Sequence, residues 1–173
     1  LSVDSEAGIF FDGKSSLRAM LEAIKGATRH IHLQSYIIED DQVGGEFKNA
    51  LIAKAQEGVE VRLMYDGFGS RKLNKKFIQE LKDAGVEILN FSPFRWFFIP
   101  LFANYRNHRK ILVVDGKTGF LGGVNIADRY YHGGVFPEWR DTHLRLTGQS
   151  VYSLQASFLL DRYFILNKNL KRR

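Results

Sequence analysis

The 173-residue chain contains no cysteine, three prolines and no apolar run long enough to cross a bilayer. The lack of cysteine excludes disulfide bonds and thiolate metal sites. No stretch rich in proline, glycine or serine divides the chain, so we expect one domain over residues 1–173. There is no signal-peptide pattern, and the first residue is Leu1 rather than methionine, which predicts a fragment of a longer protein.

The chain is basic, with a formal charge of +6 at pH 7. Its hydrophobic content of 45% and aromatic content of 13% are those of a globular protein. A positive surplus favours anionic partners, namely nucleic acid, anionic lipid surfaces or phosphorylated substrates, without choosing among them.

Strand and helix patterns alternate along the sequence. Strands are predicted at residues 9–11, 30–38, 59–65, 86–91, 109–114, 118–121 and 143–146. Helices are predicted at 15–27, 44–56, 73–84 and 151–166. Gly58 and Gly85 end two of these helices as C-caps. The last helix carries an apolar stripe of Val151, Leu154, Phe158, Tyr163 and Leu166. The alternation predicts an α/β fold with a mixed, largely parallel sheet flanked by helices.

One short segment carries the clearest chemistry. His108 and Lys110 open an apolar run that ends at Asp115 and Gly116. In a strand, residues i and i+2 project from the same face, so the imidazole and the ammonium group should lie side by side. A nucleophile beside a fixed positive charge suits phosphoryl chemistry.

The Asp-Gly pair between two apolar runs predicts a tight hairpin, which returns the chain to a Gly-Gly-Val-Asn turn. A loop at 115–116 sets Gly123 opposite His108, whereas a loop at 116–117 sets Asn125 there. Either register brings the turn to the His-Lys pair. Its glycines let a phosphate approach the backbone, and the asparagine amide can donate to a phosphate oxygen.

These residues resemble the signature of the phospholipase D superfamily, His-x-Lys-x(4)-Asp-x(6)-Gly-[Gly/Ser]-x-Asn. The positions that match it are His108, Lys110, Asp115, Gly122, Gly123 and Asn125. Within that superfamily the chain is most similar to bacterial cardiolipin synthases, through segments 27–33, 58–66, 104–110 and 139–143. Gln34 stands where many relatives of this type have glutamate. The resemblance implies a phospholipase D-like α/β/α sandwich.

The resemblance also implies a mechanism in which one histidine forms a phosphohistidine and a second protonates the leaving alcohol. His108 would be the nucleophile, while Lys110, Asn125 and Gly123 bind phosphate. No metal ion or cofactor is expected, because lysine and asparagine side chains balance the phosphoryl charge.

Two carboxylates complete the expected catalytic set. Asp115 belongs to the signature, but its strand parity is opposite to that of His108 and it falls at the turn, so we expect it to fix the hairpin or an edge of the site. A carboxylate that orients the histidine should follow the Gly-Gly turn. Asp141 matches best, and Glu138 is the alternative.

The other histidines are expected to be structural. His30 and His32 share one strand face with Gln34 and Tyr36, as in any half-buried strand. His143 has the same structural interpretation, and no usual metal-ligand spacing links these histidines. The aromatic stretch 93–102 is either a loop folded onto the core or a lip that meets lipid or a partner.

Only one His-x-Lys signature is present, whereas synthases of this type carry two. The leading hypothesis is therefore the first catalytic half of a bacterial cardiolipin synthase, which joins two phosphatidylglycerols. Its partners would be a second half in the parent chain or a two-fold dimer mate, together with a membrane surface. The parent would lie at the bacterial cell membrane, with the chain itself a soluble fragment.

Two alternatives remain. A homodimeric phosphodiesterase or nuclease of the same superfamily would use the positive charge to bind nucleic acid. A phosphate-binding module with an incomplete site would bind without turnover.

Overall fold

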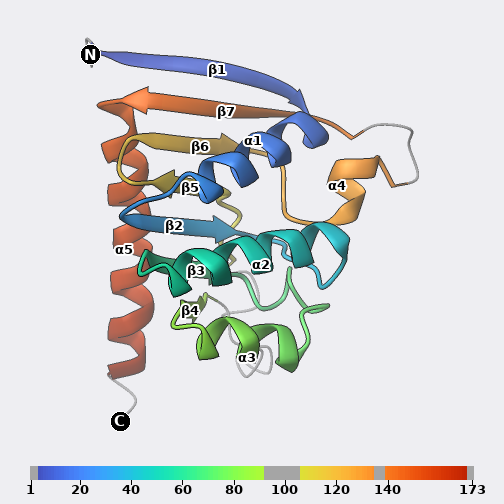
Figure 1. Ribbon diagram of the computed structural model, residues 1–173, viewed down its shortest axis with the longest axis vertical. Coiled ribbons are helices and arrows are strands. Elements are labelled where there is room, and N and C mark those ends of the chain that lie inside the picture. Colours follow the sequence, from blue (N-terminus) through green and yellow to red (C-terminus); the bar gives the residue numbers. More distant parts are fainter. Residues whose placement is uncertain (1–3, 92–105, 135–138, 171–173) are drawn as a thin grey trace.

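A seven-stranded mixed sheet organises the computed structural model, which describes residues 4–91, 106–134 and 139–170 (Figure 1). The strands are β1 Ser5–Asp12, β2 His30–Ser35, β3 Glu60–Tyr65, β4 Glu87–Asn90, β5 Ile111–Val114, β6 Thr118–Gly122 and β7 Arg140–Gly148. The helices are α1 Gly13–Lys25, α2 Gln42–Gln56, α3 Lys75–Asp83, α4 Asp128–His132 and α5 Ser150–Leu170. The strand order is β1-β7-β6-β5-β2-β3-β4.

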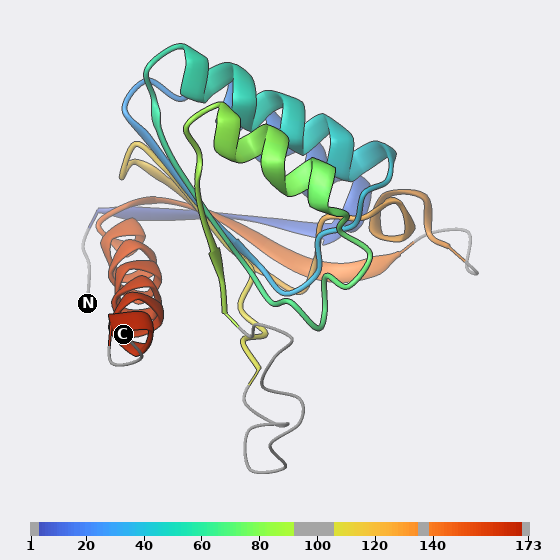
Figure 2. The ribbon, with the colours of Figure 1, turned by 90° about the horizontal axis from the view of Figure 1, so that it is seen from below.

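The helices cover both faces of this sheet. Helices α1, α2 and α3 lie on one face and α5 lies on the other, while α4 sits at one end (Figures 1 and 2). The predicted α/β/α arrangement around a mixed sheet is confirmed.

The expectation of a largely parallel sheet is wrong. Only the β2–β3 and β3–β4 pairs are parallel, and the other four neighbouring pairs are antiparallel. The helical crossovers through α2 and α3 produce the parallel pairs, whereas the hairpin between β5 and β6 needs no helix.

Helix ends follow local sequence chemistry. Asp12, Asp41 and Asn74 are N-caps whose side chains accept a hydrogen bond from the backbone N–H three residues later. Gly58 and Gly85 follow α2 and α3 with φ of +88° and +89°, as their predicted capping role requires.

Two apolar layers fill the space above and below the sheet. The larger layer, under α1–α3, includes Leu112 and Val114 of β5. The alternate residues Ile111 and Val113 face the other way and pack against Val151 of α5. This period-two alternation at β5 continues into the segment before the strand. It determines to which face of the sheet the side chains of the candidate site point.

Helix α5 presents a different stripe from the one expected. Tyr163 is 62% exposed, so its assignment to the inward stripe is wrong. The buried positions continue instead from Phe158 through Asp161 to Ile165. A buried carboxylate therefore lies on the inward face of the helix. Among the described residues, no helix combines the length and the apolar character needed to cross a membrane.

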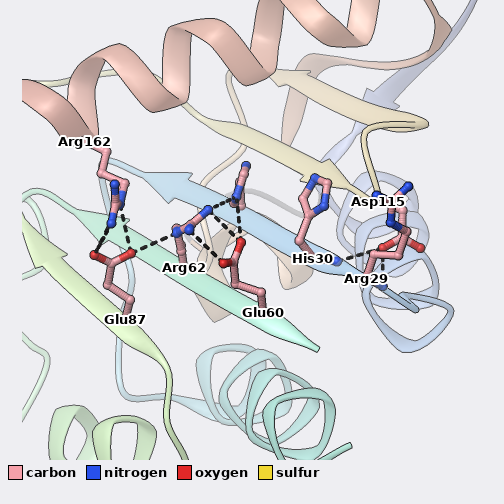
Figure 3. Close-up of polar contacts among 8 residues, drawn as sticks. Arg29, His30, Glu60, Arg62, Glu87, Asp115 and Arg162 are labelled. Atoms are coloured by element: carbon pink, nitrogen blue, oxygen red, sulfur yellow. Dashed lines mark hydrogen bonds and ion pairs between the residues drawn. The ribbon is translucent and has the colours of Figure 1, made fainter. Parts of the chain in front are cut away.

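A charged network also joins α5 to the sheet. Arg62 of β3 lies between Glu60 and Glu87, and Arg162 of α5 donates to Glu87 from the other side (Figure 3). His32 lies beside Arg62, with 2.8 Å between its Nε2 and the Arg62 NH1. The network spans β2, β3, β4 and α5, so it holds the helix in a fixed position on the sheet.

Neither predicted hairpin register is correct. Val114 pairs with Thr118, which leaves a three-residue loop at 115–117. Asp115 and Gly116 both have positive φ, at 55° and 67°, and the Lys117 N–H donates to the Val114 carbonyl at 3.0 Å. Continued past Ile111 and Leu121, the observed register sets Gly122 opposite Lys110 and Val124, rather than Gly123 or Asn125, opposite His108.

Candidate functional site

The His-Lys pair lies at the end of the two central strands where β2 ends and β5 begins. The His108 ring stacks on Tyr36, with 3.8 Å between ring centroids and 19° between planes. The Lys110 ammonium lies 5.3 Å from the centre of the same Tyr36 ring. Both side chains thus contact one tyrosine and lie side by side, as their spacing predicted, although β5 itself begins only at Ile111.

The residues on either side of His108 point the opposite way. Asn107 donates through Nδ2 to the Asp161 carboxylate at 2.7 Å, and Arg109 donates to the same carboxylate at 2.5 and 2.6 Å. The alternation seen along β5 therefore extends back to residue 107. It directs odd-numbered side chains toward α5 and leaves the imidazole of His108 exposed.

The Gly-Gly turn is pressed against β7. A Cβ on Gly122 would lie 2.5 Å from the Thr142 carbonyl oxygen and 2.6 Å from the His143 Cα. A Cβ on Gly123 would lie 2.1 Å from the Asp141 Oδ1. Close packing against β7 thus requires both glycines, in addition to any approach of a phosphate.

Asp141 acts on Lys110 through its charge. Burial lowers the pKa of Lys110, and the Asp141 carboxylate opposes that shift. The partners of the Asp141 carboxylate are the Thr142 N–H at 2.7 Å and the Trp139 Nε1 at 3.4 Å. Among the described residues, the His108 ring has no hydrogen-bond partner, so a role of Asp141 in orienting that ring stays a prediction. The alternative, Glu138, lies outside the described residues.

Asn125 is buried in a bridge between β2 and α4. Its Oδ1 accepts from the Ile37 N–H at 3.0 Å and from the Ser35 hydroxyl at 3.4 Å. Its Nδ2 donates to the Tyr130 hydroxyl at 2.7 Å. These bonds fix the turn that carries Gly123, and the direct phosphate contact of both residues stays a prediction.

Asp115 lies at the other end of β5 from His108. Its carboxylate accepts from the N–H groups of Arg29 and His30 at 2.8 and 3.0 Å (Figure 3). It also accepts from the Thr28 N–H and the Thr28 hydroxyl, both at 2.9 Å. Burial alone would raise its pKa, but these four donors lower the pKa of Asp115 to about 2. Its position favours the hairpin-fixing role over a catalytic one.

Two of the remaining histidines, His32 and His143, are held in the core. His32 stacks on Phe158 at 4.7 Å, and burial, with neighbouring positive charges, lowers the pKa of His32 to about 4. His143 is fully buried beneath the Gly-Gly turn, and burial lowers the pKa of His143 to about 4. Within the described ranges, no group of three or more histidine and carboxylate side chains is arranged to hold a metal ion.

A cavity of about 620 Å³ opens beside the His-Lys pair. Its lining comes from the residue after β4, from the segment before β5, from β6 and from α5. It comprises Phe91, Arg106, Asn107, His108, Arg109, Lys110, Leu121, Gly122, Asp161 and Phe164. Three of these side chains are cationic and one is a carboxylate. The described lining therefore suits an anionic group.

Sequence reasoning missed two residues of this site. Tyr36 was placed on the same strand face as Gln34 and was given no role in the site. In the structure it directly follows Ser35, the last residue of β2. Asp161 gave a clearer signal, because it is a carboxylate three residues after Phe158 on the inward stripe of an apolar helix.

The backbone defines the class of protein first. The chain superimposes on Nuc, a phospholipase D family member from Salmonella typhimurium, with a TM-score of 0.68 at 17% identity, over 94% of this chain and 96% of Nuc. A phosphatidylserine synthase from Haemophilus influenzae gives a TM-score of 0.68 at 17% identity, over 93% of this chain and 37% of that one. These likenesses show a phospholipase D fold.

Sequence comparison then gives the family. A family model described as "Cardiolipin synthase, PLD-like domain" matches residues 20–134, and the chain belongs to that family. It is 48% identical over 165 residues, or 95% of its length, to a cardiolipin synthase from Alkalihalophilus pseudofirmus. It is 47% identical over 171 residues, or 98% of its length, to one from a Geobacillus species. The chain spans about a third of the length of these relatives.

Proposed function

We propose that this chain is one catalytic half of a bacterial cardiolipin synthase that uses two molecules of phosphatidylglycerol. The observation that carries the proposal is the His108–Lys110 pair on Tyr36 at a cationic cavity, in a chain of the cardiolipin synthase family. The exposed imidazole can reach a phosphodiester, and Lys110 supplies positive charge beside it.

The reaction would proceed in two displacements. An imidazole nitrogen of His108 attacks the phosphorus of one phosphatidylglycerol, the bond from phosphorus to the glycerol headgroup breaks, and a general acid protonates the departing glycerol. A hydroxyl of a second phosphatidylglycerol then attacks the phosphohistidine and loses its proton to the same group. Cardiolipin forms, glycerol is released, and His108 is regenerated.

The general acid would come from a second His-x-Lys half. Among the described residues, no other histidine lies at the cavity beside His108. The greater length of the relatives leaves room for a second half in a parent chain, and a two-fold mate of this chain is the other source. With lipid substrates, the complete enzyme would work at the bacterial membrane surface.

A chimera tests this proposal. The chain replaces the matching 171 residues of the Geobacillus cardiolipin synthase, and the product is assayed on phosphatidylglycerol vesicles for cardiolipin and free glycerol. His108→Ala should abolish turnover. His132→Ala, which changes an exposed histidine on α4, should leave turnover within twofold.

Two further measurements examine the alternatives. Cleavage of single-stranded DNA by the chain alone in the presence of a chelator, lost on His108→Ala, would support a nuclease instead. A chimera that binds vesicles but forms no cardiolipin would support a binding module.

A further inference from the structure

We propose that Asp161 of α5 is a positioning residue that holds the segment on both sides of His108 and so directs its imidazole toward substrate. The inference rests on the proposed role of His108 as nucleophile. Asp161 itself does not touch the His108 ring, and it acts through the two neighbours of that residue.

The contacts form a closed bridge around one residue. The Asp161 carboxylate accepts from the Asn107 side chain at 2.7 Å and from the Arg109 guanidinium at 2.5 and 2.6 Å. The Asn107 Oδ1 accepts in turn from the Arg109 N–H at 3.0 Å. His108 therefore lies at the tip of a loop whose two sides are tied to a single carboxylate.

The bridge takes the place of strand pairing. The ladders of β5 with β2 and β6 begin at Ile111, so within the described part of the chain no backbone ladder holds residues 107–109. With Asn107 and Arg109 fixed on the α5 side, the alternation of an extended chain turns His108 to the opposite side, onto Tyr36. Without the bridge, the orientation of the His108 imidazole would no longer be fixed.

The carboxylate is itself fixed in the interior. Asp161 is 7% exposed, and Gln34 of β2 donates to it at 2.8 Å. The Arg109 side chain is 52% exposed, so the ion pair is open to solvent on one side only. Asparagine at position 161 could still accept from Asn107 and Gln34, but it would lose the charge that holds Arg109.

The test compares neighbouring residues of α5. Asp161→Asn removes the bridge charge, whereas Arg162→Gln removes the adjacent anchor to Glu87 and serves as the matched control for helix docking. Arg109→Gln is the second variant, because it removes one exposed arm and should fold even if Asp161→Asn does not. All three are examined in the chain labelled with 13C-histidine.

The readout is the NMR signal of the His108 ring. In the parent chain, the Tyr36 ring current should move the His108 ring protons away from the shifts of free histidine. Asp161→Asn and Arg109→Gln should move these signals back toward the free value, and Arg162→Gln should not. An unchanged His108 signal in folded Asp161→Asn, or an equal change in Arg162→Gln, would overturn the proposal.

Turnover in the Geobacillus chimera supplies the second readout. Asp161→Asn should lower kcat at least tenfold with KM within twofold, because a misplacement of about 1 Å can cost 100-fold. Arg109→Lys should recover most of the kcat that Arg109→Gln loses. A rise in KM at constant kcat would contradict positioning. Full activity of His108→Ala would overturn the proposed function, while the NMR comparison would still decide the bridge.

Discussion

At the residue scale, Gly122 faces backbone atoms of β7. A methyl group on Gly122 would clash with the Thr142 carbonyl oxygen and the His143 Cα. Both are backbone atoms, so side-chain rotation cannot relieve the clash. We expect Gly122→Ala to lower the free energy of unfolding by about 2–3 kcal/mol, measured by urea denaturation. Gly8→Ala in β1 is the control, because its Cβ would meet no atom within 4 Å. Equal losses at the two positions would contradict the packing argument.

Gly123 differs because its neighbour is a side chain. A Cβ there would displace the Asp141 carboxylate, which can rotate. Gly123→Ala should therefore cost less stability than Gly122→Ala, about 1 kcal/mol. Because Asp141 opposes the lowering of the Lys110 pKa, its displacement should lower that pKa further. An NMR titration of Lys110 checks this, and an unchanged or higher pKa would contradict it.

Tyr36 allows the stacking on His108 to be separated from the tyrosine hydroxyl. Tyr36→Phe keeps the ring that contacts both His108 and Lys110, whereas Tyr36→Leu removes it. We expect turnover of the chimera to stay within about threefold for phenylalanine and to fall about tenfold or more for leucine. Equal loss in both variants would assign the effect to the hydroxyl instead.

The sequence predicted part of this site for a physical reason. The side-by-side placement of His108 and Lys110 follows from strand periodicity alone, and the structure shows it. The contacts of Tyr36 and Asp161 depend on how β2 and α5 approach the segment before β5. Such approaches are set by tertiary packing, which no local pattern encodes.

At the scale of elements, Asp115 joins the β5–β6 hairpin to the start of β2. Its folded pKa of about 2 lies below the ordinary value of 3.8, so it stabilises the fold above pH 4. That contribution is lost as the pH falls from about 4 to 2. Asp115→Asn should lower stability by about 1–2 kcal/mol at pH 7, a figure reduced for its partial exposure.

Asparagine is the informative replacement because it tolerates the positive φ of this position. The difference in unfolding free energy between parent and variant should shrink below pH 4, as measured by denaturation at pH 7 and pH 3. A difference that is the same at both pH values would show that backbone geometry, rather than charge, causes the loss.

The seven strands and the four longer helices were predicted within a few residues, because hydrophobic periodicity marks each segment and Gly58 and Gly85 mark the ends of two helices. Helix α4 was missed because it has only five residues, Asp128–His132. The hairpin register was wrong by one residue, because an Asp-Gly pair is compatible with loops of two or three residues. Turn chemistry indicates a hairpin more reliably than it fixes the pairing.

At the scale of the whole molecule, two buried histidines predict sensitivity to acid. Burial is the first cause that lowers the pKa of both His32 and His143 to about 4, against an ordinary value of 6.5. For His32 the positive charges of His30, Arg62 and Arg162 add to it, and Glu87 opposes them. For His143, the Asp141 carboxylate opposes the lowering of the pKa, and the charge of Lys110 adds to it.

Both histidines are neutral in the fold, so the unfolded chain binds more protons below pH 6.5. Their stabilisation is complete above that pH and is lost as the pH falls from 6.5 to 4. Unfolding free energies measured in urea should therefore drop by about 3 kcal/mol between pH 7 and pH 5. His32→Phe and His143→Leu should each flatten this dependence. A pH dependence unchanged in both variants would contradict it.

The order of strands in the sheet lay beyond sequence reasoning. Local patterns mark each strand, but neighbours such as β2 and β5 are set by contacts between residues about 80 positions apart. The superfamily resemblance implied the layers, and the predicted predominance of parallel pairs failed because β5, β6 and β7 pair antiparallel in chain order and β1 pairs antiparallel with β7.

The pairing of β1 with β7 has a consequence for synthesis on the ribosome. Ser5 pairs with Gly148 and Asp12 with Arg140, so β1 is made long before its partner. At roughly 5 to 20 residues per second, the wait is about 6 to 25 s. Ile9 and Phe11 of β1 stay largely exposed even after folding. During translation this strand is therefore an unpaired apolar segment that a chaperone could bind, and the sheet closes at that edge only when β7 has emerged.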